Sequence, residues 1–262
     1  MPGQVLFTGE GAVAVVTLSY PGKLNAMSRA MWRELRAVFE KIQSGGQWRC
    51  VIVQGEGGTF CAGGDISEYP EFRFSEDALR EFHENDVWGG LGAVLACDVP
   101  VVAAIEGACM GAGLEIASCC DIRIACESAT FGAPIAKLGF PMAPREVQLV
   151  VRAAGESTAR EMLLEAAVLP ASEMKAKGFL SRVAADEDIR AQAWASAQRV
   201  GALAPQAARL NKQALRVLAM QPFPAGASDG ALQPIPGAYR YADSPEHREG
   251  IGAFLDKRKP VF

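Results

Sequence analysis

The sequence predicts an α/β fold in which short buried strands alternate with helices, followed by a helical C-terminal region. Two observations support this prediction. Four short runs are rich in β-branched and apolar residues, and amphipathic helical patterns lie between and after them. The chain has 262 residues and 50% hydrophobic content, which is enough to bury a large core. Strands that alternate with helices in this way are typical of α/β proteins.

The predicted strands are short, and the last three of them are almost continuously apolar. Such strands are typical of a sheet that is covered on both faces. The four strands are Val13–Leu18, Cys50–Gln54, Val101–Ile105 and Ile122–Cys126.

The helices are predicted from capping residues and from the spacing of apolar residues. Ser28 is an N-cap candidate for a helix that reaches about Gln43, and Ser75 for a second helix that reaches about Ala96. Later helices are predicted at 186–202, 206–220 and 244–257. The segment Gln221–Tyr241 is rich in Pro, Gly and Ala, so we predict an irregular connection there. We divide the chain into a core, 1–203, and a helical region, 204–262.

Composition argues against several classes of function. A net charge of −4 does not attract nucleic acid or an anionic membrane. The N-terminus has no basic segment followed by an apolar one, and no apolar run approaches the ~20 residues of a membrane span. The seven cysteines form no pair of CxxC motifs, and there are only two histidines, so we expect reduced thiols and no zinc site. We therefore expect a cytoplasmic protein.

One segment that can carry chemistry, Phe60–Ile66, follows the second predicted strand. Its residues 62 to 64 are small, which lets a ligand approach the main chain closely. Asp65 can cap a following helix and so leave the preceding N–H groups free to face an anion. Taken alone, the segment favours a structural interpretation, a glycine-rich turn between two elements.

A second segment, Ile105–Glu115, follows another buried strand and opens an apolar helix. The start of that helix offers N–H groups without partners and the positive end of the helix dipole. Glu115 lies about one turn into the helix among apolar residues, where burial would raise its pKa toward the range useful for proton transfer. The alternative is a glutamate that is simply stabilised by the dipole. Two N–H groups that converge on one oxygen would form an oxyanion hole, in which each donor contributes ~3 kcal/mol.

Both segments resemble the signature of the crotonase, or enoyl-CoA hydratase/isomerase, superfamily, and the resemblance covers the whole chain. Four further segments fit that family in order and spacing: Pro21–Met27, Cys120–Ala125, Phe131–Pro134 and Glu249–Pro260. The resemblance implies a crotonase-like spiral of β-β-α turns with two roughly perpendicular sheets. It also implies an acyl-CoA site in the core and a C-terminal region for self-association as a homotrimer or a dimer of trimers.

The resemblance implies roles for individual residues. Gly64 and Ala112 match the two oxyanion-hole positions, and Glu115 matches the first of two catalytic glutamates, which positions or activates water. It implies no metal and no cofactor beyond coenzyme A as part of the substrate. The residues expected to contact the substrate or its CoA moiety are Lys23, Ala62, Gly64, Asp65, Ile66, Gly111, Ala112, Phe254 and Lys257.

The match departs from the hydratase pattern at one position. In hydratases the second glutamate follows a Phe-Gly-x-Pro turn, which here is Phe131–Pro134, and the next residue is Ile135. An isoleucine cannot transfer a proton, and an acid–base group contributes about 10²–10⁴-fold. Seven nearby polar residues could replace the missing acid, and for each of them we favour a structural role. They are Glu68, Tyr69, His83, Glu84, Asp86, Arg145 and Glu146.

Three mechanisms remain open from the sequence, and all of them need a stabilised oxyanion or enolate. In the first, Glu115 alone serves the addition of water to an enoyl-CoA, and this is our leading prediction. In the second, Glu115 activates water for attack on the thioester carbonyl, as in a hydrolase. The third is C–C cleavage, as in decarboxylating relatives. A non-catalytic acyl-CoA binder and an RNA-binding relative are the alternatives outside these reactions, and the acidic composition disfavours the latter.

Overall fold

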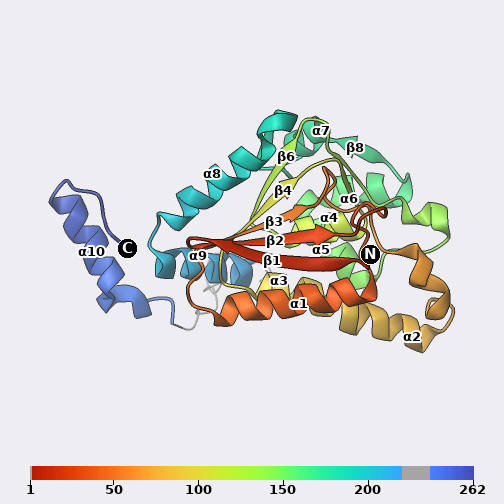
Figure 1. The fold of residues 1–262 in the computed structure, drawn as a ribbon, viewed down its shortest axis with the longest axis horizontal. Helices are drawn as coiled ribbons and strands as arrows, with labels where there is room; N and C mark the ends of the chain where they lie inside the picture. The colour runs from red at the N-terminus through yellow and green to blue at the C-terminus, as the bar shows by residue number, and fades with distance from the viewer. Residues whose placement is uncertain (1, 220–236) are drawn as a thin grey trace, which may run out of the picture.

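The computed structural model describes residues 2–219 and 237–262, and it contains two sheets (Figure 1). The larger sheet has six strands in the order β1-β2-β3-β4-β6-β9, of which only the β1–β2 pair is antiparallel. The smaller sheet has the order β5-β7-β8. The strands of the larger sheet are Gln4–Glu10, Val13–Ser19, Cys50–Gly55, Val101–Ile105, Ile122–Cys126 and Arg182–Ala184, and those of the smaller sheet are Ala108–Met110, Thr130–Gly132 and Val168–Pro170.

The four predicted strands are confirmed as β2, β3, β4 and β6, each within one residue of its predicted bounds. All residues of β4 are buried, and so are five of the six residues of β3, as expected for strands covered on both faces. Strand β1 and the three-residue strands were not predicted. The two sheets and their flanking helices confirm the α/β fold.

Helices flank the sheets and carry most of the remaining core residues. Ser28 caps α1 as predicted, because its hydroxyl accepts a hydrogen bond from the main-chain N of Met31 at 3.2 Å. Helix α8 begins after a 3₁₀ turn, Asp186–Asp188, so the helix predicted from residue 186 starts three residues late. Six helices of the core region are α1 (Arg29–Ser44), α4 (Ala112–Cys119), α5 (Pro144–Ala154), α6 (Glu156–Leu164), α7 (Ala171–Ala176) and α8 (Ile189–Gly201).

The helix predicted from Ser75 to Ala96 contains an interruption. It consists of α2 (Glu76–Glu81), a π-helical segment (Phe82–Val87) and α3 (Trp88–Ala96), with helical backbone angles at both junctions. Three residues of the π-helical segment, Phe82, Asp86 and Val87, are buried although most of its sequence is polar. A π-helical turn often marks a functional site.

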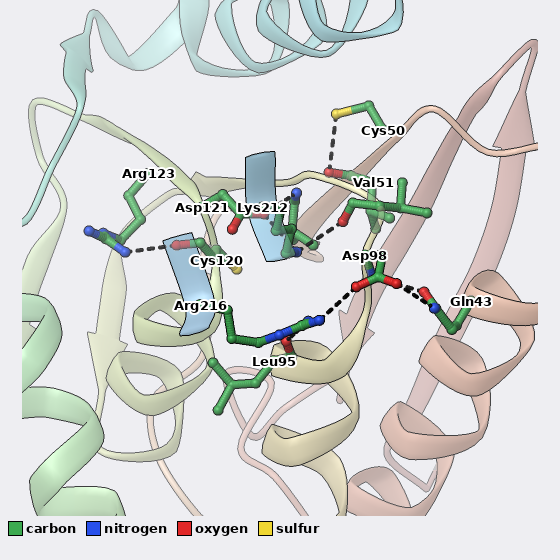
Figure 2. Close-up of polar contacts among 12 residues, drawn as sticks. Gln43, Cys50, Val51, Leu95, Asp98, Cys120, Asp121, Arg123, Lys212 and Arg216 are labelled. Atoms are coloured by element: carbon green, nitrogen blue, oxygen red, sulfur yellow. Dashed lines mark hydrogen bonds and ion pairs between the residues drawn. The ribbon is translucent and has the colours of Figure 1, made fainter. Parts of the chain in front are cut away.

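Helix α9 (Pro205–Leu218) is fastened to the core by polar contacts, as Figure 2 shows. The Lys212 ammonium lies 2.9 Å from the carbonyl oxygen of Val99 and 2.7 Å from the Asp121 carboxylate. Arg216 forms an ion pair with Asp98 at 2.7 Å. These contacts attach α9 to the beginning of β4, and the helix predicted at 206–220 begins one residue earlier, at Pro205. The division of the chain at residue 203 stays a prediction.

The last helix, α10 (Pro245–Leu255), lies apart from the sheets in Figure 1. Ser244 caps it through a hydrogen bond from the main-chain N of His247 at 3.2 Å. A 3₁₀ turn, Arg240–Asp243, precedes it, whereas most of the predicted irregular connection, residues 221–236, lies outside the described residues. Phe254 is 82% exposed and Leu255 is 72% exposed. Helix α10 therefore presents apolar side chains that stay exposed among the residues that the structure describes.

Candidate active site

The first turn of the site follows β3 and is fixed by pairing with Met27. The main-chain N of Met27 donates to the carbonyl of Gly63 at 2.8 Å, and the N of Asp65 donates to the carbonyl of Met27 at 2.9 Å. This parallel bridge uses the neighbours of Gly64 and leaves out its own N–H. Within the described residues, the Gly64 N–H has no hydrogen-bond acceptor.

Gly64 has a steric reason to be glycine. A Cβ atom at this position would lie 2.3 Å from the hydroxyl oxygen of Tyr69. Tyr69 belongs to the 3₁₀ helix Ile66–Glu71, which Asp65 caps by accepting a hydrogen bond from the N of Ser67 at 3.1 Å. The capping role predicted for Asp65 is therefore confirmed.

The second turn joins β5 to α4 at Gly111, whose φ of 47° is in the left-handed region that favours glycine. Its N–H donates to the carbonyl of Gly132 at 2.9 Å. Ala112 is the first residue of α4, where a helix offers N–H groups that have no intrahelical partner. Its N–H has no acceptor in the part of the chain that the structure describes.

The two turns are in direct contact. The N of Cys61 donates to the carbonyl of Ala108, and the N of Met110 donates to the carbonyl of Cys61, both at 2.9 Å. A Cβ atom at Gly113 would lie 2.5 Å from the carbonyl oxygen of Cys61, so α4 reaches this position only with glycine there. Main-chain hydrogen bonds and close packing thus hold the two turns together.

A cavity of about 410 Å³ lies over both turns. Six of the predicted site residues line it, and they include both residues with an unpaired N–H. These six residues are Ala62, Gly64, Ile66, Gly111, Ala112 and Glu115. The cavity wall is mainly apolar, which is typical of a site that removes its ligand from water.

Glu115 supplies a carboxyl group with altered acidity to this cavity. It lies in the first turn of α4, and its N–H donates to the carbonyl of Gly111 at 3.0 Å. Burial, followed by the nearby charge of Glu146, raises the pKa of Glu115 to about 8. A carboxyl group with such a pKa can both accept and release a proton near neutral pH.

Ile135 also lines the cavity, next to Pro134. It begins the 3₁₀ segment Pro134–Leu138 together with that proline. The position at which the hydratase pattern has a carboxylate therefore contributes an apolar side chain to the wall.

Two residues named as replacements for the missing acid, His83 and Tyr69, line the cavity, and a third, Glu146, lies beside His83. The Nδ1 atom of the His83 imidazole lies 3.0 Å from Oε1 of Glu146. Three other candidates, Glu84, Arg145 and Glu68, have partners outside the cavity. Glu84 and Arg145 form an ion pair with each other at 2.5 Å, and Glu68 accepts a hydrogen bond from the main-chain N of Arg29 at 2.8 Å.

Arg73 is a cavity residue that the sequence did not reveal. Its guanidinium carbon lies 3.6 Å from the ring centre of Phe140 and 4.4 Å from that of Tyr69. Its Nε atom is buried and has no hydrogen-bond partner among the described residues. The segment Phe72–Phe74, in which two aromatic residues flank the arginine, was the only signal in the sequence.

Four of the predicted substrate contacts do not line the cavity of this single chain. Lys23 and Asp65 form an ion pair at 2.7 Å that lies beside the first turn. Burial would raise the pKa of Asp65, but hydrogen bonds from Lys23 and Ser67 hold it below its usual value. Phe254 lies on α10 and Lys257 just after it, and neither is among the described residues that line the cavity.

The remaining sequence expectations concern thiols, metals and membranes. All seven cysteines are free and buried. The described residues contain no group of three or more metal-ligating side chains placed to hold an ion. No helix within residues 2–219 or 237–262 combines the length and apolar character that crossing a bilayer requires.

Comparisons with known proteins agree with the geometry. The model of the enoyl-CoA hydratase/isomerase family matches residues 8–262. A short-chain-enoyl-CoA hydratase of Clostridium acetobutylicum is 33% identical over 258 residues, which are 98% of this chain and 96% of that protein. A probable enoyl-CoA hydratase of Mycobacterium bovis is 30% identical, with 98% and 97% covered. The crystal structure of an enoyl-CoA hydratase/carnithine racemase from Magnetospirillum magneticum superposes with a TM-score of 0.90 at 38% identity and covers 98% of this chain and 94% of that one.

Proposed function

The chain belongs to the enoyl-CoA hydratase/isomerase family, and on this premise we propose that it adds water to an enoyl-CoA and catalyses the reverse elimination. The observation that carries this proposal is the meeting of two unpaired N–H groups, from Gly64 and Ala112, with Glu115 in one cavity. The two donors bind the thioester oxygen, which becomes negative as water adds to the β-carbon. Each donor of this kind contributes ~3 kcal/mol to transition-state binding.

Glu115 acts as the base toward water in this scheme. The ionised carboxylate takes a proton from water while the oxygen attacks the β-carbon, and the electrons of the double bond move to the thioester oxygen. The enolate then takes a proton at the α-carbon. The main chain of Ala62, Gly64 and Ile66 follows the pantetheine arm, and the Lys23–Asp65 pair lies beside this path.

The experiment that tests this proposal is hydration of crotonyl-CoA, followed by the loss of ultraviolet absorbance of the conjugated thioester. We expect turnover by the natural chain and a drop of about 10²–10⁴-fold for Glu115→Gln, because a neutral amide cannot accept the proton. Release of free thiol, measured in the same samples, separates the hydrolase alternative from hydration. Full binding of acyl-CoA without turnover of any enoyl-CoA or thioester identifies a non-catalytic binder instead.

We also propose that the chain works as a homotrimer or a dimer of trimers in cytoplasmic acyl-CoA metabolism such as that of fatty acids. Exposed apolar residues of the C-terminal region support self-association, and they are Leu215, Ile251, Phe254, Leu255 and Val261. In such an assembly Phe254 and Lys257 reach the CoA moiety in a neighbouring subunit. Light scattering during size-exclusion chromatography measures the mass, and a monomeric mass at micromolar concentration contradicts this proposal.

A further inference from the structure

The second step of hydration is protonation of the α-carbon, and the proposed roles of Gly64, Ala112 and Glu115 do not include a proton donor for it. Once water has added, the α-carbon must receive a proton, and the apolar side chain of Ile135 cannot supply it. Glu115 carries the proton taken from water. The α-carbon therefore needs another group at the cavity that has a transferable proton and is held in a fixed position by a partner.

The π-helical segment Phe82–Val87 holds His83 in a fixed position. Asp86 in this segment is 5% exposed and forms ion pairs at 2.7 Å with both Arg29 and Arg33 of α1. The side chains of Phe82 and Val87 are buried in the core. His83 is therefore carried by a backbone that is anchored on both sides of the turn, with its ring in the wall of the cavity.

Glu146 fixes the orientation of the imidazole. Its side chain is 3% exposed, and its Oε1 atom lies 3.0 Å from Nδ1 of His83. A buried carboxylate at one ring nitrogen holds the proton there and leaves the other nitrogen, Nε2, available for proton transfer. Glu146 belongs to α5, which packs against α4, the helix that carries Glu115. His83 and Glu115 line the same cavity, so the pair and the carboxyl group that acts on water belong to one site.

We propose that His83 is the second proton-transfer residue of the site, and that Glu146 is its positioning residue. The proposal rests on the proposed hydration. His83 enters the final step as the imidazolium, with one proton on Nδ1 facing Glu146 and a second proton on Nε2. The enolate oxygen returns its electron pair, the α-carbon forms a bond to the proton on Nε2, and the electrons of the broken Nε2–H bond stay on the nitrogen. The imidazole is then neutral and Glu115 is protonated. Transfer of that proton from Glu115 to His83, through solvent, restores both groups, and elimination of water follows the same steps in reverse.

Exchange of the α-protons of butyryl-CoA with deuterated water tests this assignment separately from hydration. Exchange needs an enolate and an α-carbon base but no water at the β-carbon. We expect the natural chain to catalyse both exchange and hydration of crotonyl-CoA. His83→Gln should lose about 10²–10⁴-fold in both reactions, whereas Glu115→Gln should lose hydration and keep exchange within about tenfold.

Glu146→Gln tests the positioning role, because the amide oxygen can still accept from Nδ1 while the charge is lost. It should lower kcat about 10–100-fold with little change in KM. The matched control is Glu84→Gln, which removes a neighbouring exposed carboxylate paired with Arg145 and should keep kcat within about twofold. Added imidazole should restore part of the exchange in His83→Ala and none of the hydration in Glu115→Gln.

The outcomes separate the two proposals. If the natural chain hydrates crotonyl-CoA and His83→Gln exchanges and hydrates at the natural rate, the role of His83 is overturned and the function stands. If the natural chain exchanges α-protons through His83 but hydrates no enoyl-CoA, the hydratase function fails and the role of His83 in α-proton transfer stands. If His83→Gln loses activity together with its cooperative thermal transition while His83→Asn and His83→Ala fold and remain active, the assignment is also overturned.

Discussion

Each of the two turns that meet at the cavity presents a main-chain N–H without a partner, but the local structure that leaves this N–H unpaired differs between them. The first turn leaves the Gly64 N–H free because a main-chain bridge uses its neighbours, and this position excludes even a methyl group. The second turn leaves the Ala112 N–H free because a helix begins there, and it already carries a methyl group. The second turn also brings the carboxyl group of Glu115. A donor formed by a helix start thus tolerates side chains, whereas the donor beside Tyr69 does not.

The largest effect that we expect is on the pH dependence of stability, and it comes from Glu115, since only the second turn leads to a carboxyl group. Burial raises its pKa from 4.5 to about 8, so between these pH values the folded chain binds a proton that the unfolded chain does not. The stability of the natural chain should therefore fall as pH rises through this window, by up to about 1.4 kcal/mol per pH unit from this group.

Glu115→Gln lacks this ionisation, so its advantage in stability over the natural chain should grow from pH 5 to pH 8. Urea unfolding at several pH values measures the difference. A difference that stays constant with pH contradicts the raised pKa.

Gly113→Ala tests the close packing between the two turns. Its Cβ atom would lie 2.5 Å from the carbonyl oxygen of Cys61, and a main-chain atom cannot turn aside as a flexible side chain does. We expect a loss of about 3 kcal/mol in the free energy of unfolding and loss of hydration. Gly92→Ala in α3 is the matched control, since its Cβ atom has no contact closer than 3.9 Å and alanine favours a helix. Equal stability of the two variants would show that the turns are not tightly joined.

Gly64→Ala tests the steric limit of the first turn. The methyl group would displace the Tyr69 hydroxyl or shift the N–H donor, and we expect a loss on the order of 10²-fold in kcat with a stable fold. Tyr69→Phe removes the oxygen at 2.3 Å and leaves ring carbon Cζ at 3.3 Å. The double variant should therefore recover most of the lost rate. Simple addition of the two single effects would mean that the hydroxyl is not the obstacle.

Ala112→Gly should have the smallest effect, because the second turn uses only the N–H of this residue. Activity should stay within about twofold, and stability should fall by roughly 0.5–1 kcal/mol from the added flexibility of the unfolded chain and helix start. Thermal unfolding and the crotonyl-CoA assay check this. A loss of activity as large as that of Gly64→Ala would show that the two donors respond to substitution alike.

The sequence predicted the elements whose signals are local. Continuous apolar runs located β3 and β4, and the hydroxyl of Ser28 located the start of α1. Strand β1 went unpredicted because its residues beyond Val5 are largely exposed and show no apolar alternation. The strands of the small sheet have three residues each, which is too short for a period to be seen.

The site was predicted to the extent that it lies in two continuous segments. Gly64 lies in one short segment and Ala112 and Glu115 lie in another, and the structure brings all three to one cavity. His83 and Glu146 are 63 residues apart, and no local pattern pairs them. The π-helical turn that places His83 also has no composition signal of its own.

The position of the His83 imidazole depends on the number of residues in the π-helical turn, and not only on the side chains that contact it. Asn85 is an exposed residue between His83 and the anchored Asp86. Deleting it would let the segment relax into an ordinary α-helix, in which one residue corresponds to roughly 100° of rotation. The ring would then leave the carboxylate of Glu146 although no contact of either residue had been mutated. In this way an insertion or deletion of a single codon can bring the proposed proton-transfer group, the imidazole, into the site or remove it, while the helices of the fold remain.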